Sequence, residues 1–260
     1  MEARRRICLT VAYDGTAYCG WQVQKNGNTI ESELNRALSE LTGEKIQVIG
    51  ASRTDAGVHG LCNLAVFDTC FRIPAEKLPY ALNQRLPEDI RVRESKEVAP
   101  DFHPRRCRSR KTYEYHILNA PFSNPVKRLY SYFTYAPLDV EKMRQAAAYL
   151  VGEHDFASFC SAGSQAETTV RTIYDLTVEK SGDEIVIRVT GSGFLYNMVR
   201  IIAGTLMEAG RGRMASEKME EVLAAGNRTA AGPTAPACGL ILTEICYERQ
   251  ENSDFFTNPA

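Results

Sequence analysis

The sequence has no hydrophobic run long enough to cross a membrane. Its longest nearly apolar stretch, residues 195–209, is interrupted by Asn197, Arg200 and Gly204, whereas a membrane-spanning helix needs about 20 consecutive apolar residues. A signal peptide is not expected either, because the basic residues 4–6 lead into a strand pattern and not into an apolar segment with a cleavage site. We therefore expect a cytoplasmic protein.

Clustered metal ligands and paired cysteines are also missing. The eight cysteines are spread along the chain without a Cys-x-x-Cys pair or a nearby histidine pair at the spacing of a metal site. We expect reduced, small core residues, no metal and no cofactor. A Cys62 nucleophile with His59 as its base is an alternative, but Cys62 falls in a strand pattern and no third residue is evident to orient the pair.

The net charge is only −1, but the charge is unevenly distributed. Residues 101–130 hold seven basic and two acidic side chains, a balance of +5, whereas residues 214–260 hold three basic and seven acidic ones, a balance of −4. Such polarised charge suits a protein that presents one face to a phosphate backbone. A solvated basic linker is the alternative interpretation of the first segment.

Hydrophobic periodicity predicts an α+β fold. In the first part of the chain we expect strands at 5–12, 46–49, 61–67 and 89–98 and helices at 30–41 and 74–86. Asn28 or Thr29 would cap the first helix, and Gly43 would end it. This βαββαβ order suits an open sheet with helices on one face and the other face free for a partner.

The second part of the chain repeats this pattern. We expect strands at 112–118, 173–179, 184–190 and 240–247 and helices at 140–151, 195–209 and 216–225. The expected fold is therefore two βαββαβ-like (ferredoxin- or RRM-like) halves that form a largely antiparallel mixed sheet with helices packed on it. We place an N-terminal domain at 1–104, a C-terminal domain at 105–247 and a polar tail at 248–260.

The run GASRTDAGVHG at residues 50–60 is the most informative stretch. It places Asp55 on a connection between two expected strands, with Arg53 beside it and glycines on both sides. Loops that a rigid sheet holds in place often carry catalytic residues, and glycines let a substrate or another backbone come close. An ordinary polar turn, in which Asp55 bonds its own backbone, is the alternative.

Three further motifs accompany this run: YDGTAYCGWQ at 13–22, KTYEY at 111–115 and GFLYNMVR at 193–200. In this order and at this spacing, the four motifs closely resemble those of the tRNA pseudouridine synthase A family. The resemblance extends from about Arg5 to Tyr247. It implies an isomerase that converts uridine to pseudouridine at positions 38–40 of the tRNA anticodon stem-loop, in an RNA-binding cleft to which both subunits of a homodimer contribute.

The resemblance also implies roles for individual residues. Asp55 would be the catalytic nucleophile, Tyr113 would pack against the target base and take part in a late proton transfer, and Arg200 would pair with Asp55. Arg53 would help to hold the nucleotide out of its stack. An arginine in a mostly apolar helix must reach solvent or pair with an anion, which agrees with the role of Arg200. The reaction changes no oxidation state and needs no metal.

The remaining substrate contacts are expected from the basic run Arg105, Arg106, Arg108 and Lys111. Without the resemblance, Tyr113 and Tyr115 could be alternating strand residues of which one fills the core. We interpret Trp21 as a structural anchor that could also shape the RNA cleft, His59 as a loop residue bonded to backbone, and Asp14 as a turn acceptor.

Two other classes of function would suit parts of this sequence. A non-catalytic RNA-binding module could use a βαββαβ sheet with aromatic residues, but the Lys/Arg-Gly-Phe/Tyr-Gly/Ala-Phe pattern of such modules is absent. A carboxylate-dependent glycosidase would need a second acidic partner for Asp55, and the neighbouring motifs supply arginines and a tyrosine instead.

Overall fold

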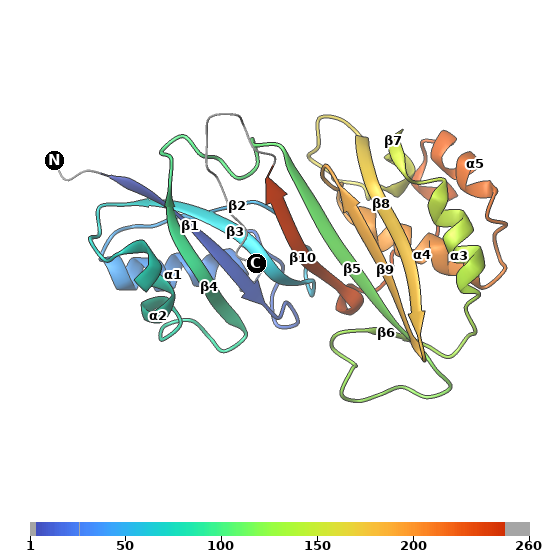
Figure 1. Ribbon diagram of the computed structural model, residues 1–260, viewed down its shortest axis with the longest axis horizontal. Helices are drawn as coiled ribbons and strands as arrows, with labels where there is room; N and C mark the ends of the chain where they lie inside the picture. The colour runs from blue at the N-terminus through green and yellow to red at the C-terminus, as the bar shows by residue number, and fades with distance from the viewer. Residues whose placement is uncertain (1–3, 26, 248–260) are drawn as a thin grey trace. The chain divides into compact units, whose positions relative to one another are not determined.

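The computed structural model describes residues 4–25 and 27–247 and shows a mixed α+β fold (Figure 1). The chain divides into two compact units. Unit 1 contains the described residues up to Ser109 together with those from Leu242, and unit 2 spans Arg110–Ile241. The domain limits at 104/105 and 247 stay a prediction, and the polar tail at 248–260 lies outside the described residues.

Unit 1 is built on a largely antiparallel sheet. Its elements are β1 (Arg5–Tyr13), α1 (Ile30–Thr42), β2 (Ile49–Gly50), β3 (His59–Thr69), α2 (Leu78–Leu82), β4 (Ile90–Val98) and, from Leu242 onward, β10 (Leu240–Tyr247). The strand order is β4-β1-β3-β10, and the short β2 also pairs with β3. The βαββαβ order of elements from β1 to β4 confirms the expectation for this part of the chain.

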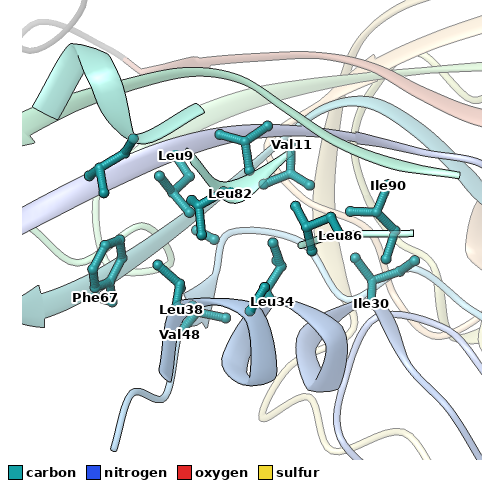
Figure 2. Close-up of a cluster of buried hydrophobic side chains, with 14 of the residues drawn as sticks. Leu9, Val11, Ile30, Leu34, Leu38, Val48, Phe67, Leu82, Leu86 and Ile90 are labelled. Atoms are coloured by element: carbon teal, nitrogen blue, oxygen red, sulfur yellow. The ribbon is translucent and has the colours of Figure 1, made fainter. Parts of the chain in front are cut away.

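Helices α1 and α2 bury their apolar sides on one face of this sheet. Figure 2 shows Leu34 and Leu38 of α1 and Leu82 of α2 pointing toward Leu9 and Val11 of β1. All five side chains are buried. Burial of a leucine-sized side chain contributes roughly 1.5–3 kcal/mol, so this cluster fixes the sheet whose connections carry Asp55.

Local signals set the limits of α1 as expected. The Thr29 side chain accepts a hydrogen bond from the backbone N–H of Ser32, and Gly43 ends the helix at φ 72°. The helix expected at 74–86 is shorter: it consists of a 3₁₀ turn at Ala75–Lys77 followed by α2. It ends because the Asn83 amide bonds both the N–H and the carbonyl of Val92 in β4, at 2.9 Å each.

The opposite face of the unit 1 sheet is not open over its whole area, contrary to the expectation. Cys8 of β1 and Val66 of β3 form a second buried cluster there with Phe102, and Tyr247 of β10 packs against this cluster. The Phe102 and Tyr247 rings meet edge to face at 5.4 Å. The segment that precedes the basic run is therefore anchored to the sheet.

The strands of unit 2 follow the order β5-β9-β8-β7, in which neighbouring strands are antiparallel, and β6 pairs with β5 in parallel. Its elements are β5 (Ser109–Asn119, in this unit from Arg110), β6 (Tyr132–Thr134), α3 (Val140–Ala148), β7 (Gly152–Asp155), β8 (Val170–Ser181), β9 (Glu184–Gly191), α4 (Met198–Gly210) and α5 (Lys218–Ala224). The β8–β9 hairpin turns at Gly182 with φ 57°, as expected.

Three details of unit 2 differ from the expectation. The short strands β6 and β7 were not foreseen, α3 ends at Ala148, and α4 starts at Met198 because residues 192–197 form the turn that enters it. Whether the two parts of the chain are ferredoxin-like stays a prediction. Among the described residues, no helix is long and apolar enough to cross a membrane.

Candidate active site

Asp55 lies on the connection between β2 and β3, as predicted, and its side chain is half-buried. Its carbonyl accepts a hydrogen bond from the N–H of Val58 at 3.1 Å, which closes a turn. The backbone on either side of Asp55 is tied to the first motif: Trp21 N–H donates to the Thr54 carbonyl, and Gly57 N–H donates to the Tyr18 carbonyl. These bonds hold the backbone of the loop on both sides of Asp55.

Two glycines of the first motif allow this close approach. A Cβ on Gly20, which has φ 87°, would lie 2.7 Å from the Thr54 carbonyl oxygen. A Cβ on Gly15 would lie 2.0 Å from the Val58 carbonyl oxygen, which is far inside contact distance. Only glycine fits at both positions, so the first motif has a structural task in shaping the Asp55 loop.

A buried polar network supports the same loop from beneath. The Tyr13 and Thr54 hydroxyl groups are 2.8 Å apart, and the Asn63 side chain of β3 is fully buried. The Asn63 amide donates to the Ser52 carbonyl and accepts from the Ser52 N–H. Buried polar side chains are nearly always hydrogen-bonded. The two bonds of the Asn63 amide therefore tie Ser52, the residue before Arg53, to β3.

The neighbouring histidine is bonded to backbone, as expected, but it is the first residue of β3 and not a loop residue. His59 Nδ1 accepts a hydrogen bond from the Gly15 N–H at 3.1 Å and lies 3.1 Å from a carboxylate oxygen of Asp14. That carboxylate also accepts from the Thr16 N–H, as expected of a turn acceptor. Trp21 is a buried anchor whose indole lies against Gly50.

The surroundings of Cys62 disfavour a cysteine nucleophile there. Burial raises the pKa of the Cys62 thiol to about 11, so little thiolate forms at neutral pH. All eight cysteines are free, but only Cys8 is fully buried, so the expectation of core cysteines holds for that residue alone. Within residues 4–25 and 27–247, no three His, Cys, Asp or Glu side chains are grouped to hold a metal ion.

The basic run begins beside the Asp55 loop. Partial burial lowers the pKa of the Arg105 guanidinium, and the positive charge of Arg53 lowers it further. Two cations that repel each other in this way favour an anion between them. Arg105, Arg106 and Arg108 are exposed, and Arg105 and Arg106 lie in a turn in which the Arg105 N–H donates to His103 Nδ1.

Unit 2 brings the third and fourth motifs together. Tyr113 of β5 is largely buried, and its ring meets the ring of Phe194 edge to face, with centroids 5.2 Å apart. Tyr115, on the same face of the strand, is fully buried and donates from its hydroxyl to the Pro236 carbonyl at 2.8 Å. Both tyrosines are therefore buried, and Tyr115 is the more completely enclosed of the two. Lys111 is half-buried at the start of the same motif.

Arg200 lies in the first turn of α4, a helix that is buried on nearly all sides. Its Nε donates to the Ala235 carbonyl at 2.7 Å, and its Nη1 donates to Asn197 Oδ1 at 2.9 Å. The Ala235 N–H in turn donates to the Arg200 carbonyl. The close packing of this segment on α4 needs Gly204, because a Cβ there would lie 1.7 Å from the Pro233 carbonyl oxygen.

The expected site residues thus fall into two structural groups. Asp55, Arg53 and Arg105 belong to unit 1, whereas Tyr113 and Arg200 belong to unit 2. Sequence reasoning missed three supporting residues: Asn63, Phe194 and Asn197. A polar residue within the apolar pattern of β3 was the available signal for Asn63, but nothing in the sequence showed which residues it contacts.

Known proteins resemble the chain over most of its length. A family profile described as tRNA pseudouridine synthase matches residues 9–105 and 146–248. The tRNA pseudouridine synthase A of Thermoanaerobacter sp. is 49% identical over 243 residues, which cover 94% of this chain and 100% of that protein. The protein of the same name from Acetivibrio thermocellus is 47% identical over 243 residues, with the same coverage.

Among solved structures, one of the archaeal box H/ACA sRNP Nop10–Cbf5 complex has a TM-score of 0.36 and 12% identity, covering 77% of this chain and 44% of that chain. A similarity this distant carries no argument. The family profile and the curated relatives do, because they extend over both units and over the Asp55 loop. The chain belongs to the tRNA pseudouridine synthase A family and is therefore an isomerase of the pseudouridine synthase type.

Proposed function

We propose that this chain converts uridine to pseudouridine at positions 38–40 of the tRNA anticodon stem-loop, with Asp55 as the nucleophile and without a metal or cofactor. The observation that carries the proposal is the Asp55 loop, in which the family motif Arg53-Thr54-Asp55 lies in a turn bonded on both sides to the first motif. A reaction that detaches and reattaches a base needs a carboxylate at a fixed position, and these backbone bonds fix the loop that carries Asp55.

The reaction breaks the bond between uracil N1 and ribose C1′ and forms a bond between uracil C5 and C1′. The C5 proton leaves and N1 gains a proton, so no oxidant or reductant takes part. Attack of Asp55 on the ribose, attack on the base and removal of a sugar proton all need an ionised carboxylate. We propose that Arg200 keeps the Asp55 carboxylate ionised at neutral pH, because its guanidinium would pair with the carboxylate.

Two other residues would handle the base. Tyr113 would stack on the extruded uracil, which contributes about 1–3 kcal/mol per base, and would take part in the late proton transfer from C5. Its edge contact with Phe194 supports this role because it fixes the ring plane. Arg53 would hold the target nucleotide out of its stack, and the nearby Arg105 would add a second cation for the phosphate backbone.

The experiment that tests the function uses tRNA carrying tritium at uridine C5. Pseudouridine formation releases the tritium and leaves the mass of the unlabelled RNA unchanged, and full release after exhaustive chelation would support metal independence. A non-catalytic RNA-binding protein would bind without releasing tritium, and a glycosidase would release free uracil. Mapping the modified positions by sequencing then tests the assignment to 38–40.

The basic run Arg105, Arg106, Arg108 and Lys111 would contact tRNA phosphates. Replacing all four residues by Gln is expected to weaken tRNA binding and to lower the slope of log K against log salt by roughly one unit per lost contact. The matched control replaces four exposed cations outside the site by Gln: Lys77, Lys180, Arg213 and Lys218. Equal slopes in the two quadruple variants would remove the run from the RNA interface.

We also propose that the chain forms a homodimer through an exposed apolar loop of unit 2. In the connection between β5 and α3, Phe122 and Val126 are each 85% exposed and Tyr135 is 77% exposed. Val126 also lines a cavity of about 220 Å³ together with Tyr130. An exposed apolar loop with a hollow beside Val126 can fit a second copy in a two-fold interface, which uses the same surface on both subunits.

Val126→Glu is expected to weaken this dimer by roughly 100-fold, because it places a charge in the apolar surface without disturbing the fold of an exposed loop. Sedimentation equilibrium at micromolar concentration is then expected to show a monomer for this variant and a dimer for the wild type. Val151→Glu, which adds the same charge just after α3, is the control and should stay dimeric. A dimeric Val126→Glu protein would place the interface elsewhere.

We propose the cytoplasm as the site of action. The eight free cysteines support this assignment, because a reducing compartment keeps thiols unpaired. Localisation of a fluorescently tagged chain in its own host tests it.

A further inference from the structure

We propose that Asn197 is a positioning residue for the reaction: its side-chain amide, itself held by Ser161, fixes the plane of the Arg200 guanidinium. This inference rests on the proposed function, in which Arg200 acts on Asp55. Asn197 Oδ1 accepts from Arg200 Nη1 at 2.9 Å, and Asn197 Nδ2 donates to Ser161 Oγ at 3.0 Å. The Ser161 N–H donates to the carbonyl of Tyr196, which ties both segments together.

The orientation of the Asn197 amide follows from its partners. A guanidinium only donates hydrogen bonds, so the amide oxygen must face Arg200. The amide NH₂ must then face Ser161, whose hydroxyl oxygen accepts. The bond to Asn197 and the Arg200 Nε bond to Ala235 together use two of the five guanidinium donors and define its plane. Rotation of the guanidinium would break at least one of them.

The backbone conformation of Asn197 indicates that its side chain does more than form the turn before α4. Asn197 has φ 60° and ψ 8°, and it is the one non-glycine residue with positive φ in the described part of the chain. Glycine adopts this conformation at no steric cost, and asparagine is tolerated there. Asn197 occupies the N-cap position of α4, yet its side chain makes no capping hydrogen bond. The amide is directed to Arg200 instead of the helix.

The test is Asn197→Gly, which keeps the left-handed backbone and removes only the amide. We expect kcat to fall about tenfold, the size expected for a lost hydrogen bond to a charged group, while KM for tRNA changes less than twofold. Ser161→Ala, which frees the amide to rotate, should lower kcat by a smaller factor. The double variant should be no slower than Asn197→Gly alone, because both act through one contact. Thermal unfolding checks that all variants remain folded.

Combining Asn197→Gly with Arg200→Leu separates this inference from the proposed function. If Asn197 acts through Arg200, Asn197→Gly lowers kcat when Arg200 is present but does not lower it further in the Arg200→Leu protein. A normal kcat for Asn197→Gly beside a slow Arg200→Leu overturns the positioning role and leaves the function of Arg200 in place. A normal kcat for Arg200→Leu overturns both, because no guanidinium would then need to be positioned. Wild-type tritium release shows independently that the chain is active.

Discussion

Asp55→Asn is expected to bind tRNA about as tightly as the wild type and to form no detectable pseudouridine, even in a single turnover with enzyme in excess. Asparagine keeps the size of the side chain but removes its charge and most of its nucleophilicity. The loop should keep its shape, because its backbone bonds to Trp21 and Tyr18 do not involve the carboxylate. Tritium release from C5-labelled tRNA measures the chemistry, and filter binding measures the affinity.

The matched control is Asp183→Asn, the same change at an exposed turn of the β8–β9 hairpin. It removes an equal charge and should leave both binding and turnover at wild-type values. If Asp55 were only a turn residue, Asp55→Asn would remain active and lose at most about 1 kcal/mol of stability. A folded, tRNA-bound Asp55→Asn protein that isomerises uridine would falsify the assignment of the nucleophile.

The accuracy of the fold prediction depended on how local the relevant interactions are. Helix α1 was predicted nearly to the residue, because Thr29 and Gly43 act within one turn of its ends. The helix expected at 74–86 was too long, because Asn83 bonds to a strand that follows later in the chain. Strand β7 exists through its pairing with β8, and a four-residue strand of this kind carries no periodic signal of its own.

For the site residues, too, the sequence predicted what depends on neighbouring residues and missed what depends on distant ones. The position of Asp55 on a connection followed from the apolar strand patterns around it. The proximity of Arg53 and Arg105, by contrast, depends on how the segment after β4 folds back on the sheet through Phe102. The left-handed turn at Asn197 was equally hidden, because asparagine also occurs in ordinary turns and at helix starts. The motif marked the region, and only the structure identified the contacts.

Arg200→Leu is expected to reduce turnover by roughly 100-fold near neutral pH, the equivalent of about 3 kcal/mol of lost charge pairing. Leucine suits the apolar helix, whose neighbouring residues Val199 and Ile201 are buried, so the fold should tolerate it. Under the pairing of Arg200 with Asp55 that we propose, loss of the cation is expected to raise the pKa of the Asp55 carboxyl, since a paired guanidinium favours the charged form.

The acidic limb of the pH–rate profile should therefore move to higher pH in Arg200→Leu, and turnover should partly recover as the pH is raised. Arg200→Lys should restore only part of the rate, because an ammonium lacks the planar fork that donates to Asn197 and Ala235 from fixed positions. The measurement is kcat against pH for the wild type and both variants, with circular dichroism as the control for folding. An unshifted acidic limb in Arg200→Leu would show that Arg200 does not set the ionisation of Asp55, and its task would then be confined to contacts within unit 2.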